Sequence, residues 1–212
     1  KSNVSGEIIL TGNTVIDALL YTSEKTKKIK LKDLDWDKYR VILSTIHRRE
    51  NWGENINKIA YSLRTILDKY KDIALLLPMH KNKRIRKPLL DLLDNHPRAY
   101  LVEPLDYIDC VSAIKHCYIL LTDSGGLQEE APSLGKPVLV LRNTTERPEA
   151  IKAGNSVLVG TDHEKITHEV DKLLNNNSYY KKVSNSINPF GDGKASKRIV
   201  SACLEFLNLE NN

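Results

Sequence analysis

Short apolar runs alternate along the chain with amphipathic stretches, and this alternation limits the possible fold more than any other feature. The runs are rich in Val, Ile and Leu, which is typical of strands covered on both faces. Strands are predicted at 40–46, 73–77, 99–102, 118–122, 137–141 and 156–159. Helices are predicted at 14–24, 55–70, 82–94, 107–115, 127–134, 146–153, 163–175 and 194–208. Strand–helix units in series predict an α/β fold, a Rossmann-like parallel sheet with helices on both faces.

A chain of 212 residues is long enough for one large domain. Irregular structure is expected at residues 1–8 and at 175–193, a segment rich in Asn, Ser and Gly. No apolar run approaches the ~20 residues that a membrane helix needs, and the polar start has no signal-peptide core, so no membrane partner is expected. The first residue is not Met, so we expect the chain to begin partway through a longer protein.

Cysteine and charge usage narrow the class of protein further. The three cysteines form no C-x-x-C pair, which favours a reducing, cytoplasmic compartment over a disulfide framework or a zinc site. The net charge of +5 is mild, and the basic residues are scattered. The run KNKRIRK at 81–87 fits phosphate contact, but a solvated helical turn is favoured. Without a basic stripe and interleaved aromatics, no nucleic-acid partner is expected.

Polar residues follow five successive predicted strands, at the edge where parallel sheets bind ligands. They are the segments HRRENWG at 47–53, PMHK at 78–81, EPL at 103–105, TDSGG at 122–126 and RNTTERP at 142–148. A purely structural domain would not need polar residues at the same edge of five strands. This coincidence predicts a single site.

The glycine turn DSGGLQEE at 123–130 is the most informative of these segments. Gly125 and Gly126 let a ligand approach the backbone, the N–H groups at a helix start favour phosphate, and Ser124 adds a hydroxyl. Glu130 lies farther along that helix and could accept hydrogen bonds from a ribose diol. The residues alone leave open a tight turn in which Ser124 or Asp123 caps the helix.

Two further side chains suit a phosphorylated ligand. His47 lies in a run of cations, where it could donate to a phosphoryl oxygen or act as an acid on a leaving group. The guanidinium fork of Arg147 suits a diphosphate. A packing or capping histidine, and an ion pair of Arg147 with Glu146 or Glu149, remain the alternatives. Arg48 and His80 fit the same interpretation with less support.

Several common site patterns are absent from the sequence. It contains no G-x-G-x-x-G, Walker, G-x-S-x-G or H-E-x-x-H motif, so no dinucleotide, P-loop nucleotide, serine nucleophile or metal site is predicted. Cys110 and Cys117 are interpreted as packing thiols.

Longer motifs resemble a known family. They are TGNTVID at 11–17, HRREN at 47–51, EPL at 103–105, the run DSGGLQEEAPSLGKPVLVLRNTTERPEAIKAG from 123, and NPFGDGKAS at 188–196. Their order resembles that in the C-terminal half of the non-hydrolysing UDP-N-acetylglucosamine 2-epimerases. The resemblance implies the second, UDP-binding domain of a two-domain glycosyltransferase-B type fold, spanning residues 1–212 with a terminal helix at 194–212.

The resemblance also implies roles for particular residues. Ser124, Gly125, Gly126 and Arg147 would hold the diphosphate, and Glu130 the ribose hydroxyls. The loop at Leu105, with Cys110 nearby, would meet the uracil. His47 would face the phosphates and the sugar as the catalytic residue. Arg48 and His80 match positions that bind a second, activating UDP-GlcNAc in some bacterial members.

The reaction that the resemblance implies interconverts UDP-GlcNAc and UDP-ManNAc by elimination and re-addition of UDP, without metal or nicotinamide cofactor. The general base would come from an N-terminal domain that this chain lacks, so the chain alone is expected to bind UDP without turnover. The full-length protein is expected to be a homodimer. The alternatives are a UDP-sugar glycosyltransferase domain of the same fold, a hydrolysing 2-epimerase that releases free ManNAc, and an RNA-binding domain with salt-sensitive affinity.

Overall fold

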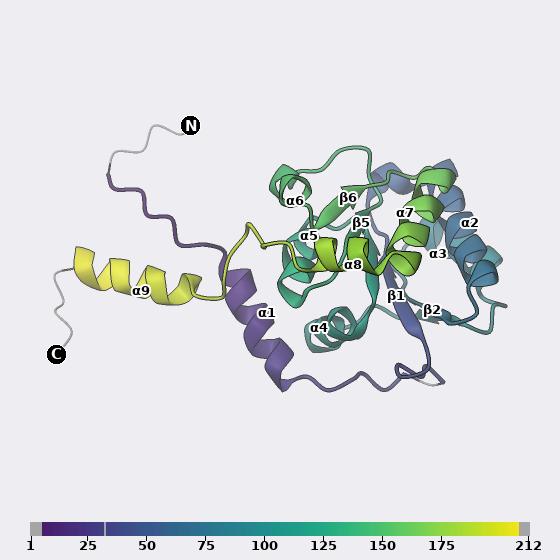
Figure 1. The fold of residues 1–212 in the computed structure, drawn as a ribbon, viewed down its shortest axis with the longest axis horizontal. Coiled ribbons are helices and arrows are strands. Elements are labelled where there is room, and N and C mark those ends of the chain that lie inside the picture. The colour runs from purple at the N-terminus through teal and green to yellow at the C-terminus, as the bar shows by residue number, and fades with distance from the viewer. Residues whose placement is uncertain (1–5, 32, 208–212) are drawn as a thin grey trace.

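The computed structural model describes residues 6–31 and 33–207 (Figure 1). At its centre is a parallel sheet of six strands in the order β3-β2-β1-β4-β5-β6. The strands are β1 (Arg40–Thr45), β2 (Ile73–Pro78), β3 (Ala99–Val102), β4 (Ile119–Thr122), β5 (Val138–Val140) and β6 (Ser156–Leu158). The Rossmann-like α/β class predicted from the sequence is confirmed, and each predicted strand is present within one or two residues of its expected bounds.

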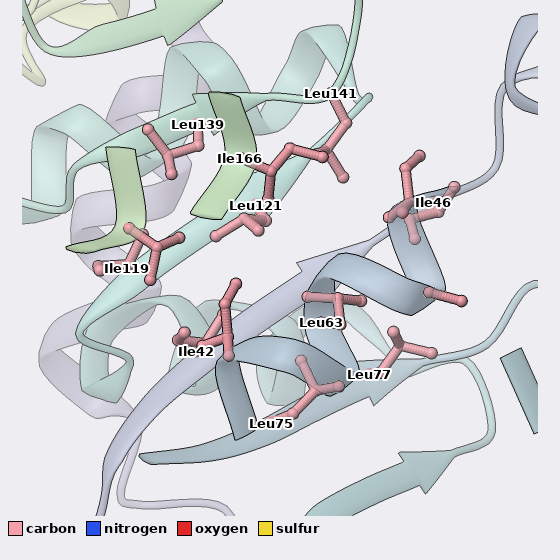
Figure 2. Close-up of a cluster of buried hydrophobic side chains, with 14 of the residues drawn as sticks. Ile42, Ile46, Leu63, Leu75, Leu77, Ile119, Leu121, Leu139, Leu141 and Ile166 are labelled. Atoms are coloured by element: carbon pink, nitrogen blue, oxygen red, sulfur yellow. The ribbon is translucent and has the colours of Figure 1, made fainter. Parts of the chain in front are cut away.

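The strands are parallel and apolar because helices cover both faces of the sheet. In β1, Ile42 points to one buried cluster while Val41 and Leu43 point to the other, as the two-residue period of a strand requires. The register aligns Ile42 with Leu75 of β2 and Ile119 of β4. The three side chains share one face in the larger cluster (Figure 2).

The larger cluster lies under α2 (Glu54–Lys69), α3 (Lys83–Leu93), α7 (His163–Asn175) and α8 (Asn177–Ser184). Figure 2 shows Leu63 of α2 and Ile166 of α7 reaching onto the strands. The opposite face is covered by α4 (Tyr107–His116), α5 (Gly125–Glu130), the 3-10 turn η2 (Ala131–Leu134) and α6 (Pro148–Ala153). The helix α1 (Thr14–Lys25) packs on α4. The two clusters together hold the sheet in place, and the site loops follow the carboxyl ends of its strands.

The helices α8 and α5 differ from the sequence prediction, and α6 begins at Pro148, two residues later than predicted. The segment 175–193, expected to be irregular, contains α8, whose Val183 is buried and whose Tyr180 hydroxyl donates to the Tyr118 carbonyl at 3.0 Å. Tertiary packing therefore makes a helix where local composition indicates a loop. The helix α5 begins at Gly125, two residues earlier than predicted. Glycine is a poor helix former, which favours a later start, but the fold holds Gly125 and Gly126 in helical conformation.

The helix α9 (Ala195–Phe206) extends away from the sheet beside the N-terminal stretch and α1 (Figure 1). It exposes several apolar side chains, as does the stretch before α1: Ile8, Leu10, Val200 and Phe206. The predicted helix at 194–208 is thus present, with residue 208 outside the described residues, as are residues 1–5 of the predicted irregular start. Within the described part of the chain, no helix has both the length and the apolar character needed to cross a membrane.

Candidate functional site

The candidate site lies where the strand order reverses, between the neighbouring strands β1 and β4. In open parallel sheets the crevice beyond the carboxyl ends of such strands is the usual ligand site. Here β1 leads into His47 and Arg48, and β4 leads into Asp123 and the glycine turn. The hydroxyls of Thr45 and Thr122 lie 2.6 Å apart and join the two strand ends.

Asp123 holds the loop after β1 in place. Its carboxylate is fully buried and accepts hydrogen bonds from the backbone N–H groups of His47 and Arg48 and from Asn51 Nδ2. His47 Nδ1 lies 2.9 Å from Asp123 Oδ1. Burial acts to raise the pKa of Asp123, but the hydrogen bonds from His47, Arg48 and Asn51 outweigh it, so the pKa lies below its ordinary value. The carboxylate is therefore ionised at neutral pH.

The glycine turn begins α5 without a side-chain cap. Ser124 occupies the N-cap position, but its side chain makes no capping hydrogen bond, and the carboxylate of Asp123 faces the β1 loop instead. Ser124 is thus the N-cap residue that the alternative interpretation names, but neither its side chain nor that of Asp123 caps the helix with a hydrogen bond. Gly126 is open on its outer side, since a Cβ there would meet nothing nearer than Ser124 Oγ at 3.9 Å.

Arg48 reaches over the same turn. Its Nη2 lies 3.5 Å from the position that a Cβ on Gly125 would take, and its Nη1 lies 3.1 Å from Glu146 Oε1. Glu146 also pairs with the buried Arg142, which binds Glu50 of the β1 loop as well. Hydrogen bonding from Arg142 lowers the pKa of Glu146 to about 2. This ion network fixes the loops after β1 and β5 against each other.

Arg147 has a different partner from those expected. Its Nε donates to Glu129 of α5, and its Nη1 donates to the Glu146 backbone carbonyl at 3.1 Å. The alternative of a side-chain ion pair between Arg147 and Glu146 or Glu149 is wrong, because α5 brings Glu129 closer. About a third of the Arg147 side chain, 34%, remains exposed.

Glu130 lies at the end of α5 with only 8% of its surface exposed. Burial, with a smaller contribution from the neighbouring Glu129 charge, raises the pKa of Glu130 to about 7. Burial and the Glu130 charge also raise the pKa of Cys110 to about 11. The Cys110 thiol is thus neutral at physiological pH, as expected for a packing thiol.

A cavity of about 200 Å³ opens at the carboxyl ends of β1, β2 and β3. Its lining includes four of the residues predicted for the site: His47, His80, Leu105 and Cys110. A dry cavity of about 150 Å³ can hold benzene, so this space suits one planar ring. The remaining lining is mostly apolar, from Leu43, Ile46, Pro78, Met79 and Pro104.

The structure thus brings the predicted residues into two adjoining groups at one edge of the sheet. One group is the glycine turn, with Arg48 over it and Arg147 paired with Glu129 farther along α5. The other group is the cavity lining, which includes His47 of the loop that Asp123 holds. The structural roles of Glu50, Glu129 and Arg142 were not predicted, although all three residues lie in the segments named above. Their ion pairs depend on which strands are neighbours in the sheet, and the positions of the strands along the sequence do not reveal that order. Within residues 6–31 and 33–207, no cluster of three or more His, Cys, Asp or Glu is arranged to hold a metal ion.

Comparison with known proteins gives one consistent family. The UDP-N-acetylglucosamine 2-epimerase family model matches residues 1–204. The UDP-N-acetylglucosamine 2-epimerase of Neisseria meningitidis serogroup A is 46% identical over 212 residues, covering 97% of this chain and 57% of that protein. The chain spans 52% to 57% of the length of the first curated relatives that it matches.

Solved structures agree with the sequence comparison. A co-structure of S. aureus MnaA with UDP superposes with a TM-score of 0.89 at 43% identity, covering 96% of this chain and 56% of that chain. A crystal structure of the N. meningitidis UDP-GlcNAc 2-epimerase bound to UDP-GlcNAc gives a TM-score of 0.85 at 46% identity, covering 93% of this chain and 55% of that chain.

Proposed function

The chain belongs to the UDP-N-acetylglucosamine 2-epimerase family, and we propose that it is the C-terminal half of such an enzyme and holds the UDP part of the substrate. The observation that carries this proposal is the convergence, at one sheet edge, of an uncapped glycine turn, two arginines and a ring-sized cavity. The likeness to a relative whose structure contains UDP supports the choice of ligand.

UDP would lie across the reversal point of the sheet. The N–H groups of Gly125 and Gly126 and the hydroxyl of Ser124 would bind the diphosphate, with Arg147 beside them. The uracil would enter the cavity at Leu105 and Cys110, and Glu130 would accept hydrogen bonds from the ribose hydroxyls. A buried carboxyl with a pKa of about 7 can lose its proton to meet these donors at little cost.

The proposed reaction inverts C2 of the sugar. A base removes the C2 proton, the C1–O bond breaks, and UDP leaves, so that the sugar becomes a 2-acetamidoglucal. UDP then adds back to C1 as a proton reaches the opposite face of C2. This chain would stabilise the negative charge that develops on the leaving diphosphate, through N–H donors and arginines. His47 would donate a proton to a phosphoryl oxygen from Nε2, the ring nitrogen that is turned away from Asp123.

The base would come from the half of the enzyme that the relatives contain and this chain does not span. Apolar side chains on α9 and before α1 are exposed, with Phe206 at 85% and Leu10 at 93%, and such a surface supports contact with a further part of the protein.

The second activating UDP-GlcNAc would lie near Arg48 and His80. His80 lines the same cavity as His47, while Arg48 lies at the glycine turn.

An isotope experiment with the full-length protein tests the reaction. UDP-GlcNAc incubated in deuterium oxide should give UDP-ManNAc carrying deuterium at C2, together with traces of UDP and the glucal. Release of free ManNAc would identify a hydrolysing enzyme instead. Transfer of the sugar to an added acceptor, without deuterium at C2, would favour the glycosyltransferase alternative.

A further inference from the structure

The carboxylate of Asp123 has two sides with different surroundings. Oδ2 accepts from three donors: the backbone N–H groups of His47 and Arg48, at 3.0 and 2.9 Å, and Asn51 Nδ2 at 2.9 Å. Oδ1 lies 2.9 Å from His47 Nδ1 and also accepts, at 3.1 Å, from the His47 backbone N–H that it shares with Oδ2. These contacts hold the side chain in the fully buried space between β1 and β4. None of the proposed substrate contacts uses this carboxylate.

An ionised carboxylate accepts hydrogen bonds but cannot donate them. His47 Nδ1 must therefore carry a hydrogen, and in the neutral ring the lone pair then lies on Nε2. The His47 side chain lines the cavity and is 42% exposed, so the ring edge that is not turned to Asp123 remains accessible. Within the described residues, Nε2 of His47 has no hydrogen-bond partner.

His80 on the same cavity has the opposite arrangement. The backbone N–H of Asn82 donates to His80 Nδ1 at 3.2 Å, so that nitrogen accepts and the neutral ring carries its hydrogen on Nε2. The cavity is therefore lined by one histidine whose Nε2 accepts and another whose Nε2 donates. His80 gives an internal reference for any measurement on His47.

We propose that Asp123 is a positioning residue for His47, fixing the Nδ1–H tautomer and turning Nε2 toward the bound ligand. The use of that nitrogen in catalysis rests on the proposed function. In the elimination step, protonated His47 would pass the Nε2 proton to a phosphoryl oxygen as the C1–O bond breaks. The ring is then neutral with its Nδ1 hydrogen retained, Asp123 stays ionised, and UDP returns the proton to Nε2 on re-addition.

A purely structural role for Asp123, joining two loops, makes a different prediction. In Asp123→Asn, the amide oxygen should stay with the three donors that now face Oδ2, because an NH₂ group there would meet all three, whereas on the Oδ1 side it meets only the His47 backbone N–H and the His47 ring. The NH₂ group then faces His47 Nδ1, which must become an acceptor. The substitution should thus invert the tautomer of His47, whereas loss of a structural tether alone would not.

The test is a ¹H–¹⁵N correlation spectrum of the histidine rings in the ¹⁵N-labelled chain, at a pH where the rings are neutral. Wild-type His47 should show the Nδ1–H tautomer and His80 the Nε2–H tautomer. In Asp123→Asn, His47 should change to Nε2–H while His80 is unchanged. Asn51→Ala is the matched control, because it removes a buried donor to Asp123 and should leave the His47 tautomer as in wild type.

The wild-type spectrum decides even where Asp123→Asn fails to fold: a His47 ring in the Nε2–H tautomer overturns the proposal. A folded Asp123→Asn with an unchanged Nδ1–H tautomer overturns it as well. In the full-length enzyme, Asp123→Asn should lower kcat for epimerisation about 100-fold with KM nearly unchanged. An unaltered kcat overturns the catalytic use of the tautomer. Absence of epimerisation in wild type would instead refute the proposed function and leave the spectroscopic result standing.

Discussion

Asn13 Nδ2 donates a hydrogen bond of 2.6 Å to Glu129 Oε2, joining the segment before α1 to the helix that follows the glycine turn. The other oxygen of Glu129 accepts from Arg147. The Asn13 backbone N–H donates to the Phe190 carbonyl at 3.0 Å. The Glu129 carboxylate therefore joins Asn13 to Arg147 and holds Arg147 at the proposed diphosphate site, while Asn13 is itself bound to the segment at Phe190.

Glu129→Gln should weaken both the fold and the site. The change leaves Asn13 and Arg147 with a neutral partner that can accept at only one atom, which should cost about 1–3 kcal/mol in the free energy of unfolding. UDP affinity should fall as well, because Arg147 loses its orientation. Urea unfolding and calorimetry measure the two effects. Glu149→Gln, at an exposed position of α6, is the control and should match wild type; an equal loss there would contradict the pairing.

Gly126→Ala should abolish UDP binding without loss of stability. A Cβ at this position fits the free protein, and Ala in a helix is favoured over Gly by up to about 1 kcal/mol. The added methyl group would stand where the diphosphate is proposed to approach. Gly193→Ala is the contrast, because that glycine has a φ of +78° and its Cβ would lie 2.6 Å from Leu20 Cδ1. It should destabilise the fold; UDP binding by folded Gly126→Ala at wild-type affinity would refute the proposed approach.

Ser124→Ala should weaken UDP binding by about 1–3 kcal/mol, the effect of removing one polar partner from the ligand. Stability should change little, because the Ser124 side chain makes no capping hydrogen bond to α5. Calorimetric titration with UDP measures the change. Ser178→Ala is the matched control, since Ser178 is exposed on α8. Equal UDP affinities in the two variants would remove Ser124 from the site.

Glu130 should make stability depend on pH. The folded pKa of about 7 lies above its ordinary value of 4.5, so between these values the folded state keeps a proton that the unfolded state has lost. This contribution is fully present below pH 4.5 and is lost as pH rises through 7, a decrease of about 3 kcal/mol.

Glu130→Gln should remove that decrease, because the amide stays neutral at every pH. Unfolding by urea at pH 5 and pH 8 gives the difference between wild type and variant. Glu24→Gln, at an exposed position of α1, should keep the wild-type dependence. A Glu130→Gln variant with the same pH dependence as wild type would show that the carboxyl ionises normally.

The sequence predicts the sheet well, because apolar runs such as that of β1 are fixed by burial on both faces. It also predicts the site edge, since the carboxyl ends of parallel strands must share one side. The strand order is harder to predict, and with it the contact between His47 and Asp123, which needs β1 and β4 to be neighbours. Asp123 is identifiable only as a candidate cap from its place before Ser124.

The helix α8 and the Arg147 ion pair escape prediction for a related reason. Tyr180 stacks on Tyr118 with ring centroids 4.2 Å apart, a contact between residues remote in sequence that outweighs the loop-like composition around α8. Glu129, rather than a neighbour of Arg147 in sequence, receives its guanidinium because α5 lies across the loop after β5. Local patterns describe elements, whereas these pairings follow from how the elements pack.

Calorimetric titration of the chain and of the full-length protein with UDP tests whether this fold holds the UDP part of the substrate, with NAD and a short RNA as controls. We expect saturable binding of UDP, with no binding of NAD or RNA. A full-length protein that fails to bind UDP, or that binds NAD or RNA equally well, would contradict it.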